Sequence, residues 1–151
     1  MKRCHTLPMI VLSLATSMSA CAQERPAATE PLPEGPHVTL SERRLTLENH
    51  QGRCALRSKT DQTLLQLEIP WPCQFSPDRR SGEPRVEHFN GAQIIIVRHI
   101  DFDTPTPGSC RSQYQAIRWF NNQLEPSVVA HSASCTTGAV DQKNFVGLFK
   151  W

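Results

Sequence analysis

The amino-acid sequence predicts a mostly β fold: a small antiparallel sheet, sandwich-like or barrel-like, stapled by disulfides. Three observations support this prediction. Apolar and polar residues alternate from 65 to 69, which is the pattern of a half-buried strand. An Asn-Gly pair at 90–91 stands before a strongly apolar run, and four cysteines lie between residues 54 and 135.

The first strand candidates are two short apolar stretches, Val38–Leu40 and Leu45–Leu47. Cys54–Arg57 is the next, and residues 58–61 (SKTD) are typical of a turn. The alternating stretch that follows, 65–69, has leucine or isoleucine at every second position. Side chains two residues apart share one face of a strand, so this strand should bury one face.

Asn90-Gly91 is the strongest hairpin signal, because both positions of its turn require a positive φ. Arg85–Phe89 would form the first strand and Ala92–His99 the return strand. Within the return strand, Ile94–Val97 is apolar on both faces, which indicates a central strand covered on both sides.

A second hairpin is predicted around Asn121-Asn122, with Gln113–Phe120 and Gln123–Ala130 as its strands. Pro126 marks the return strand as an edge strand or a bulge, because proline cannot donate to the ladder. The tail, Asp141–Trp151, is a candidate for one short helix.

In that helix Asp141 would be the N-cap, and Phe145, Leu148 and Phe149 would point inward. Gly147 and the short span limit its intrinsic stability.

The N-terminus is predicted to be a signal peptide, residues 1–20. Lys2 and Arg3 are a basic n-region, and residues 7–15 are an apolar segment too short to cross a bilayer as a helix. Met18-Ser19-Ala20-Cys21 resembles the lipobox of bacterial lipoproteins. The resemblance implies cleavage before Cys21, lipidation of that cysteine with palmitate-type chains, and, with Ala22 next, an outer-membrane location facing the periplasm.

A plain secretory peptide, cut after Ala20 or Ala22, is the alternative. Both readings place the domain in an oxidising compartment. Residues 21–36 would then be the lipidated cysteine and a tether with four prolines, and 37–151 the periplasmic domain. Two or more acyl chains hold a protein in a membrane durably, at about 0.8 kcal/mol per buried methylene.

The cysteines predict two disulfides. Cys4 leaves with the signal peptide and Cys21 carries lipid; the domain keeps Cys54, Cys73, Cys110 and Cys135. The midpoint of 110 and 135 falls beside the Asn121-Asn122 turn, so these two should lie nearly opposite across that hairpin, with a bulge near Pro126 absorbing a two-residue offset. That leaves Cys54 with Cys73. A zinc site, the competing interpretation, requires close pairs such as C-x-x-C, and the sequence has none.

The net charge argues against nucleic acid as a partner. Removing Lys2 and Arg3 reduces the 16 Lys+Arg to 14, which equals the 14 Asp+Glu, so the mature charge is zero. A neutral domain lacks the basic surface that nucleic acid or anionic lipid attracts.

No catalytic or nucleotide-binding motif is found, so neither a catalytic residue nor a cofactor is assigned. His99, Asp101 and Asp103 would share one face if the strand continued, as a cation site could require, but the Pro-rich stretch from residue 104 predicts an ordinary strand end instead. No metal site is therefore assigned.

Two loops are candidates for partner binding. Residues 76–84, with Arg79 and Arg80, lead into the first hairpin, and residues 101–109, with Asp101 and Asp103, leave it. Both are expected at its open end, where they would pair with each other or form a docking rim.

Trp71, between Pro70 and Pro72, is predicted to be either a core residue or an exposed contact. In overall plan, the chain is similar to lipoprotein inhibitors and immunity proteins, which block lysozymes or peptidoglycan-attacking toxins in the periplasm. That resemblance implies a protein-binding module. An acidic face is expected of an inhibitor of a strongly basic lysozyme, so a toxin-specific immunity role suits the neutral charge better.

Two alternatives stay open. One is a structural lipoprotein bound to an outer-membrane assembly machine or to peptidoglycan. The other is a small periplasmic hydrolase that uses His88 or His99 with a carboxylate in a cleft.

Overall fold

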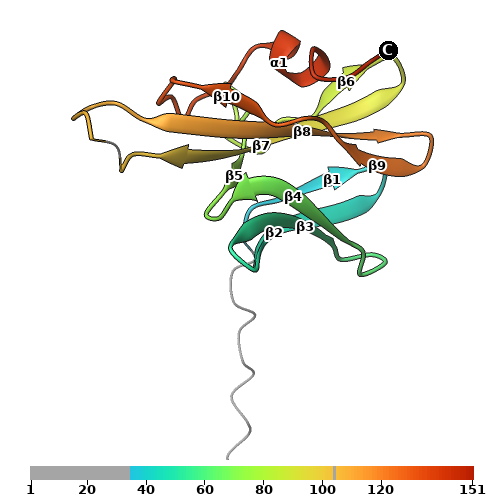
Figure 1. Ribbon diagram of the computed structural model, residues 1–151. Coiled ribbons are helices and arrows are strands. Elements are labelled where there is room, and N and C mark those ends of the chain that lie inside the picture. Colours follow the sequence, from blue (N-terminus) through green and yellow to red (C-terminus); the bar gives the residue numbers. More distant parts are fainter. Residues whose placement is uncertain (1–34, 104) are drawn as a thin grey trace, which may run out of the picture. The chain divides into compact units, whose positions relative to one another are not determined.

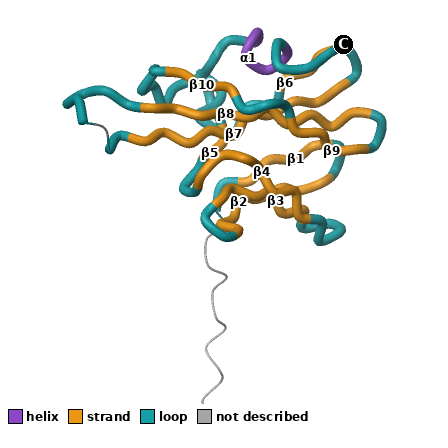
Figure 2. Tube along the Cα trace, viewed as in Figure 1, coloured by secondary structure: helices purple, strands orange, loops and turns teal. Residues whose placement is uncertain are grey.

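The computed structural model of the protein describes residues 35–103 and 105–151. The expected signal peptide, the lipidation site Cys21 and the tether up to residue 34 lie outside the described residues. In the described part, strands predominate and the only helix is short, as Figure 2 shows. The predicted mostly β fold is confirmed. It takes the form of two separate antiparallel sheets rather than one closed barrel.

The first half of the domain forms a four-stranded meander. Its strands are β1 (His37–Leu40), β2 (Arg43–His50), β3 (Arg53–Ser58) and β4 (Leu64–Pro70), which lie in the sheet in this same order. All neighbours are antiparallel, as short connections between consecutive strands require. The two short stretches at 38–40 and 45–47 thus form strands, as their apolar pattern predicted.

The second half forms a six-stranded sheet around the long hairpin β7–β8. Its strands are β5 (Gln74–Phe75), β6 (Glu87–Phe89), β7 (Ala92–Asp101), β8 (Arg111–Phe120), β9 (Gln123–Pro126) and β10 (Ala130–Ser132). β5 and β6 pair with one side of β7, and β9 and β10 with the far side of β8. β7 is therefore central, as its two apolar faces predicted (Figure 1).

Both predicted two-residue turns form. Phe89 pairs with Ala92 across Asn90 and Gly91, whose φ angles are +46° and +76°. The second turn, at Asn121 and Asn122, has φ angles of +48° and +61°. Positive φ at both positions gives the twist that suits a tight hairpin.

The return strand of the second hairpin is interrupted, which corrects the expected continuous strand Gln123–Ala130. β9 ends where Pro126 pairs with Ile117, and pairing resumes where Ala130 faces Tyr114. Three residues on one strand thus span two on the other. This is the bulge that Pro126 predicted.

The main core lies between the two sheets. Its buried side chains come from both of them: Val38, Leu40, Leu45, Cys54, Leu56, Leu67, Ile69, Phe75, Ile95, Val97 and Ile117. On β7, Ile95 and Val97 face this core, whereas Ile94 and Ile96 belong to a second cluster on the outer face of the sheet. Alternate side chains of β7 thus pack into the core on one face of the sheet and into the second cluster on the other face.

The C-terminal segment covers that outer face. Helix α1 (Gln142–Val146) inserts the fully buried Phe145 over the second cluster. The guanidinium of Arg85 lies 4.8 Å from the Phe145 ring centroid and donates to the Val140 carbonyl at 2.8 Å. Asp141 is the N-cap residue, but its side chain makes no capping hydrogen bond, contrary to the sequence expectation.

Both disulfides have the predicted partners. Cys54 and Cys73 are joined with their Cα atoms 6.2 Å apart, and Cys110 and Cys135 with theirs 5.6 Å apart. The first ties β3 to the segment that enters β5, so it links the two sheets. The second joins the residue before β8 to the loop after β10.

Candidate functional site

The last residues of β7 extend past β5, and the loop that connects β7 to β8 leads away from the sandwich there, as Figure 1 shows at its left side. Pairing of β5 with β7 reaches only Arg98, whereas β7 and β8 stay paired to Asp101 and Arg111. We call residues 99–113 the overhang, of which residue 104 is not described. The Cys110–Cys135 bridge ties its β8 side to the body of the domain.

One face of the overhang is polar. His99 pairs with Gln113, which in turn pairs with His131 on β10, and Asp101 pairs with Arg111. Directly paired residues project to the same side of a sheet, so these five side chains share the face that continues the core. The buried Val97–Gln115 pair stands one row inward and marks where that core ends.

Asp101 organises the start of the loop. It accepts a hydrogen bond at 2.8 Å from Arg111 Nη2 and another at 2.9 Å from the Asp103 backbone N–H. These two interactions, the arginine first, lower the pKa of Asp101 below its ordinary value. The loop therefore leaves the sheet with a fixed ion pair at its base.

The loop then presents an aromatic side chain to solvent. Phe102 is 62% exposed, between Asp101 and Asp103. Sequence reasoning assigned this loop through its aspartates and missed Phe102. The available signal was an aromatic residue outside any strand pattern, next to a Pro- and Gly-rich stretch.

Trp71 belongs to the same end of the domain. The ring nitrogen Nδ1 of His99 lies 2.8 Å from the Pro72 carbonyl oxygen, which places the Trp71–Pro72 segment beside the overhang. That peptide bond is cis. Trp71 itself is 37% exposed, so it is a surface residue rather than the core residue that the sequence also allowed.

The loop that carries Arg79 and Arg80 lies elsewhere. It leaves the sheet beside Ile96, whose carbonyl accepts from the Ser76 N–H at 2.8 Å, while β7 continues to Asp101. Inside the loop, Asp78 accepts from the backbone N–H groups of Ser81 and Arg80, which lower its pKa. Among the described residues, no ion pair joins this loop to the two aspartates.

The expected meeting of the two loops therefore does not occur, because β5 and β6 share one side of β7 and leave its last residues beyond them. Asp101 forms its ion pair with Arg111 on the neighbouring strand β8 instead.

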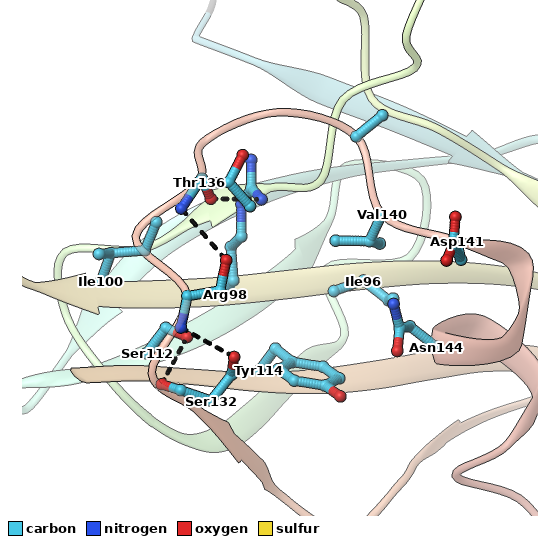
Figure 3. Close-up of a pocket in the computed structure, with 12 residues that line it drawn as sticks. Ile96, Arg98, Ile100, Ser112, Tyr114, Ser132, Thr136, Val140, Asp141 and Asn144 are labelled. Carbon is cyan, nitrogen blue, oxygen red and sulfur yellow. Dashed lines mark hydrogen bonds between the residues drawn. The ribbon is translucent and has the colours of Figure 1, made fainter. Parts of the chain in front are cut away.

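The outer face of the six-stranded sheet holds a cavity of about 270 Å³ (Figure 3). Its floor includes Ile96, Arg98 and Tyr114, and the segment after β10 crosses over it to α1. Sequence reasoning missed this cavity. The sequence feature that could have indicated it is Arg98, a charged residue directly after the apolar run 94–97 in a strand expected to be buried on both faces.

Neither histidine of the hydrolase alternative is hydrogen-bonded to a carboxylate in the described residues. His99 contacts a backbone carbonyl, and His88 lies 3.4 Å from the Gln93 amide. In the same part of the chain, no three His, Cys, Asp or Glu side chains gather where they could hold a metal ion. No described helix has the length and apolar character needed to span a membrane.

Comparisons of the chain with protein-family models, with curated proteins and with solved structures found no match.

Proposed function

We propose that this protein is an outer-membrane lipoprotein whose periplasmic domain binds and blocks another protein, a cell-wall-cleaving enzyme or toxin. Cys21 would carry the lipid, residues 22–36 would be the tether, and the overhang would enter or cover the partner's cleft. The lipobox-like Met18–Cys21 segment and the Pro-rich stretch after it support the anchor.

The exposure of Phe102 on a braced loop is the observation that carries the binding proposal. Apolar side chains this exposed are candidates for contacts, and interface energy concentrates in a few aromatic and arginine residues. The Asp101–Arg111 ion pair and the Cys110–Cys135 bridge hold both sides of the loop. Strand ends that are fixed at the base of a loop lose less entropy when the loop binds.

The neighbouring groups suit a protein partner better than an apolar small molecule. Trp71, whose neighbour Pro72 contacts His99 through its carbonyl, offers a second, partly exposed ring, and the polar face of the overhang carries histidine, carboxylate and guanidinium groups. Because the mature charge is zero, long-range attraction would not select a strongly basic lysozyme. We therefore favour a specific toxin as the partner, which makes this an immunity protein.

The test is capture from periplasmic extract by the full chain, followed by assay of the captured enzyme on purified peptidoglycan. We expect stoichiometric capture of a wall-cleaving enzyme and loss of its activity in the complex. Phe102→Ala should weaken binding by about tenfold or more. Val128→Ala is the matched control, because Val128 is 69% exposed yet lies between β9 and β10, outside the overhang.

Capture of no enzyme, or equal weakening by both substitutions, would contradict the proposal. Increased detergent sensitivity of a deletion strain without any toxin would favour the envelope-assembly alternative instead. The anchor is tested separately: Cys21→Ala should release the protein from membranes, and the mass of the wild-type N-terminus should show acylation.

A further inference from the structure

Arg98 is a buried cation on the outer face of the six-stranded sheet. It is 5% exposed, and its cross-strand partner on β8 is Tyr114. The guanidinium donates to the Gly138 carbonyl at 2.8 Å and to the Thr136 carbonyl at 3.2 Å, and it also contacts the Thr137 carbonyl. Arg98 thus holds the loop after Cys135 against the sheet.

The charge of Arg98 is not matched by a carboxylate. No ion pair includes it among the described residues, and its buried Nε has no hydrogen-bond partner there. Desolvation lowers its pKa from the ordinary value. Carbonyl oxygens accept from its two terminal nitrogens, but their dipoles do not neutralise a buried charge, which is costly without an opposite charge nearby.

The cavity beside Arg98 is lined with hydroxyl groups that have hydrogen atoms to donate. The side-chain oxygens of Ser132, Ser134 and Thr136 each accept a backbone N–H two residues further on, at 3.0, 3.4 and 3.1 Å. No acceptor for their own O–H groups is found in the described residues. These groups and the cation together favour an anionic oxygen group at this end.

The far end of the cavity has the opposite character. Asp141 and Asn144 lie at the α1 side, away from Thr136, as Figure 3 shows. Asp141 makes no capping hydrogen bond, and its nearest cation is the exposed Lys143, at 3.9 Å. Between the two ends, Ile96, Val140 and the Tyr114 ring provide an apolar middle.

We propose that this cavity binds a small zwitterion of the size of an amino acid or a dipeptide. Its carboxylate lies against Arg98 and the hydroxyls, and its ammonium group lies toward Asp141 and Asn144. A volume of about 270 Å³ is below the usual range for drug-sized ligands, which suits a molecule of this size. The proposal does not depend on the overhang or on the proposed inhibition of an enzyme.

The test is an NMR titration of the full chain with four probes: the dipeptide Ala-Ala, its C-terminal amide, its N-acetyl form, and the neutral N-acetyl amide. We expect Ala-Ala to shift the signals of Tyr114 and Asn144. Loss of the carboxylate or of the ammonium group should weaken binding, the former by about tenfold.

Asp141→Asn should weaken binding of Ala-Ala by about fivefold and leave binding of N-acetyl-Ala-Ala unchanged, because only the first ligand has an ammonium group. Asp103→Asn, a carboxylate substitution on the overhang, is the matched control and should change neither. Phe102→Ala should also leave both affinities intact, which separates this proposal from the enzyme-binding one.

Arg98→Met should abolish binding of every probe with a carboxylate. If that variant does not fold, the four probes and Asp141→Asn decide the matter on the wild-type scaffold. No shift at about 20 mM Ala-Ala, or equal affinity for Ala-Ala and its amide, would overturn the proposal.

Discussion

The side chain of Gln115 on β8 connects the two sheets through the backbone of Glu68. Its Oε1 accepts from the Glu68 N–H at 3.0 Å, and its Nε2 donates to the Ser127 carbonyl at 2.7 Å. Glu68 lies on β4, an edge strand, so this N–H has no ladder partner on that side. The buried side-chain amide of Gln115 thereby gives a hydrogen-bond partner to the Glu68 N–H on the edge strand and to the Ser127 carbonyl in the bulge after Pro126.

We expect Gln115→Ala to lower the free energy of unfolding by about 2 kcal/mol, because it leaves the part-buried Glu68 N–H and the buried Ser127 carbonyl without partners. Urea unfolding followed by tryptophan fluorescence measures this. Gln66→Ala is the control, since Gln66 is exposed on β4 and should change the stability little. Equal losses in both variants would contradict the bridging role.

Loss of the Cys110–Cys135 bridge should destabilise the domain by about 3 kcal/mol, because the bridge restricts the unfolded chain across a separation of 25 residues. The double variant Cys110→Ala, Cys135→Ala is compared with the wild type in urea. It should also expose the 136–138 loop that bonds to Arg98, seen as faster amide exchange there. An unchanged exchange rate in that loop would show that Arg98 alone holds it.

Glycine should favour the second position of both hairpin turns, so removing it from one turn and adding it to the other should change stability in opposite directions. Gly91→Ala places a Cβ at a φ of +76°, so we expect a loss of about 1 kcal/mol in unfolding free energy. Asn122→Gly should raise stability by a few tenths of a kcal/mol, since Asn-Gly is the preferred pair for such a turn. Thermal melts of both variants check these signs, and a stabilising Gly91→Ala would contradict the turn geometry.

Asp61 should contribute to acid sensitivity. Hydrogen bonds from Ser58 and Thr63, followed by one from Arg43, hold the pKa of Asp61 well below its ordinary value. A carboxyl group with a lowered folded-state pKa adds stability above its unfolded pKa of about 4, and this stability is lost as the pH falls toward the folded value. Asp61→Asn should therefore reduce stability at neutral pH and flatten the decline below about pH 4.

Denaturant unfolding between about pH 2 and pH 7 tests this expectation. Glu83→Gln serves as the control, because Glu83 is exposed and its side chain makes no ion pair in the described residues. An Asp61→Asn variant with the wild-type pH profile would show that the lowered pKa has no effect on folding.

Local patterns in the sequence determined most of the strands and turns. The alternation at 65–69, the two apolar faces of 94–97 and the two asparagine turns each depend on neighbouring residues, and each is confirmed. Cys110 and Cys135 could also be paired in advance, because a tight hairpin fixes which residues stand opposite. The expected lipidation of Cys21 stays a prediction.

Only the tertiary structure decided which surface groups come together. Local patterns do not show how far β7 runs beyond β5 and β6. The Arg79 loop was therefore expected beside Asp101, whereas the structure has Trp71–Pro72 beside the overhang. Arg98 could be seen in the sequence, but its three carbonyl partners belong to a loop about 40 residues away. Strand lengths and chain crossings depend on packing between distant segments, which local periodicity does not encode.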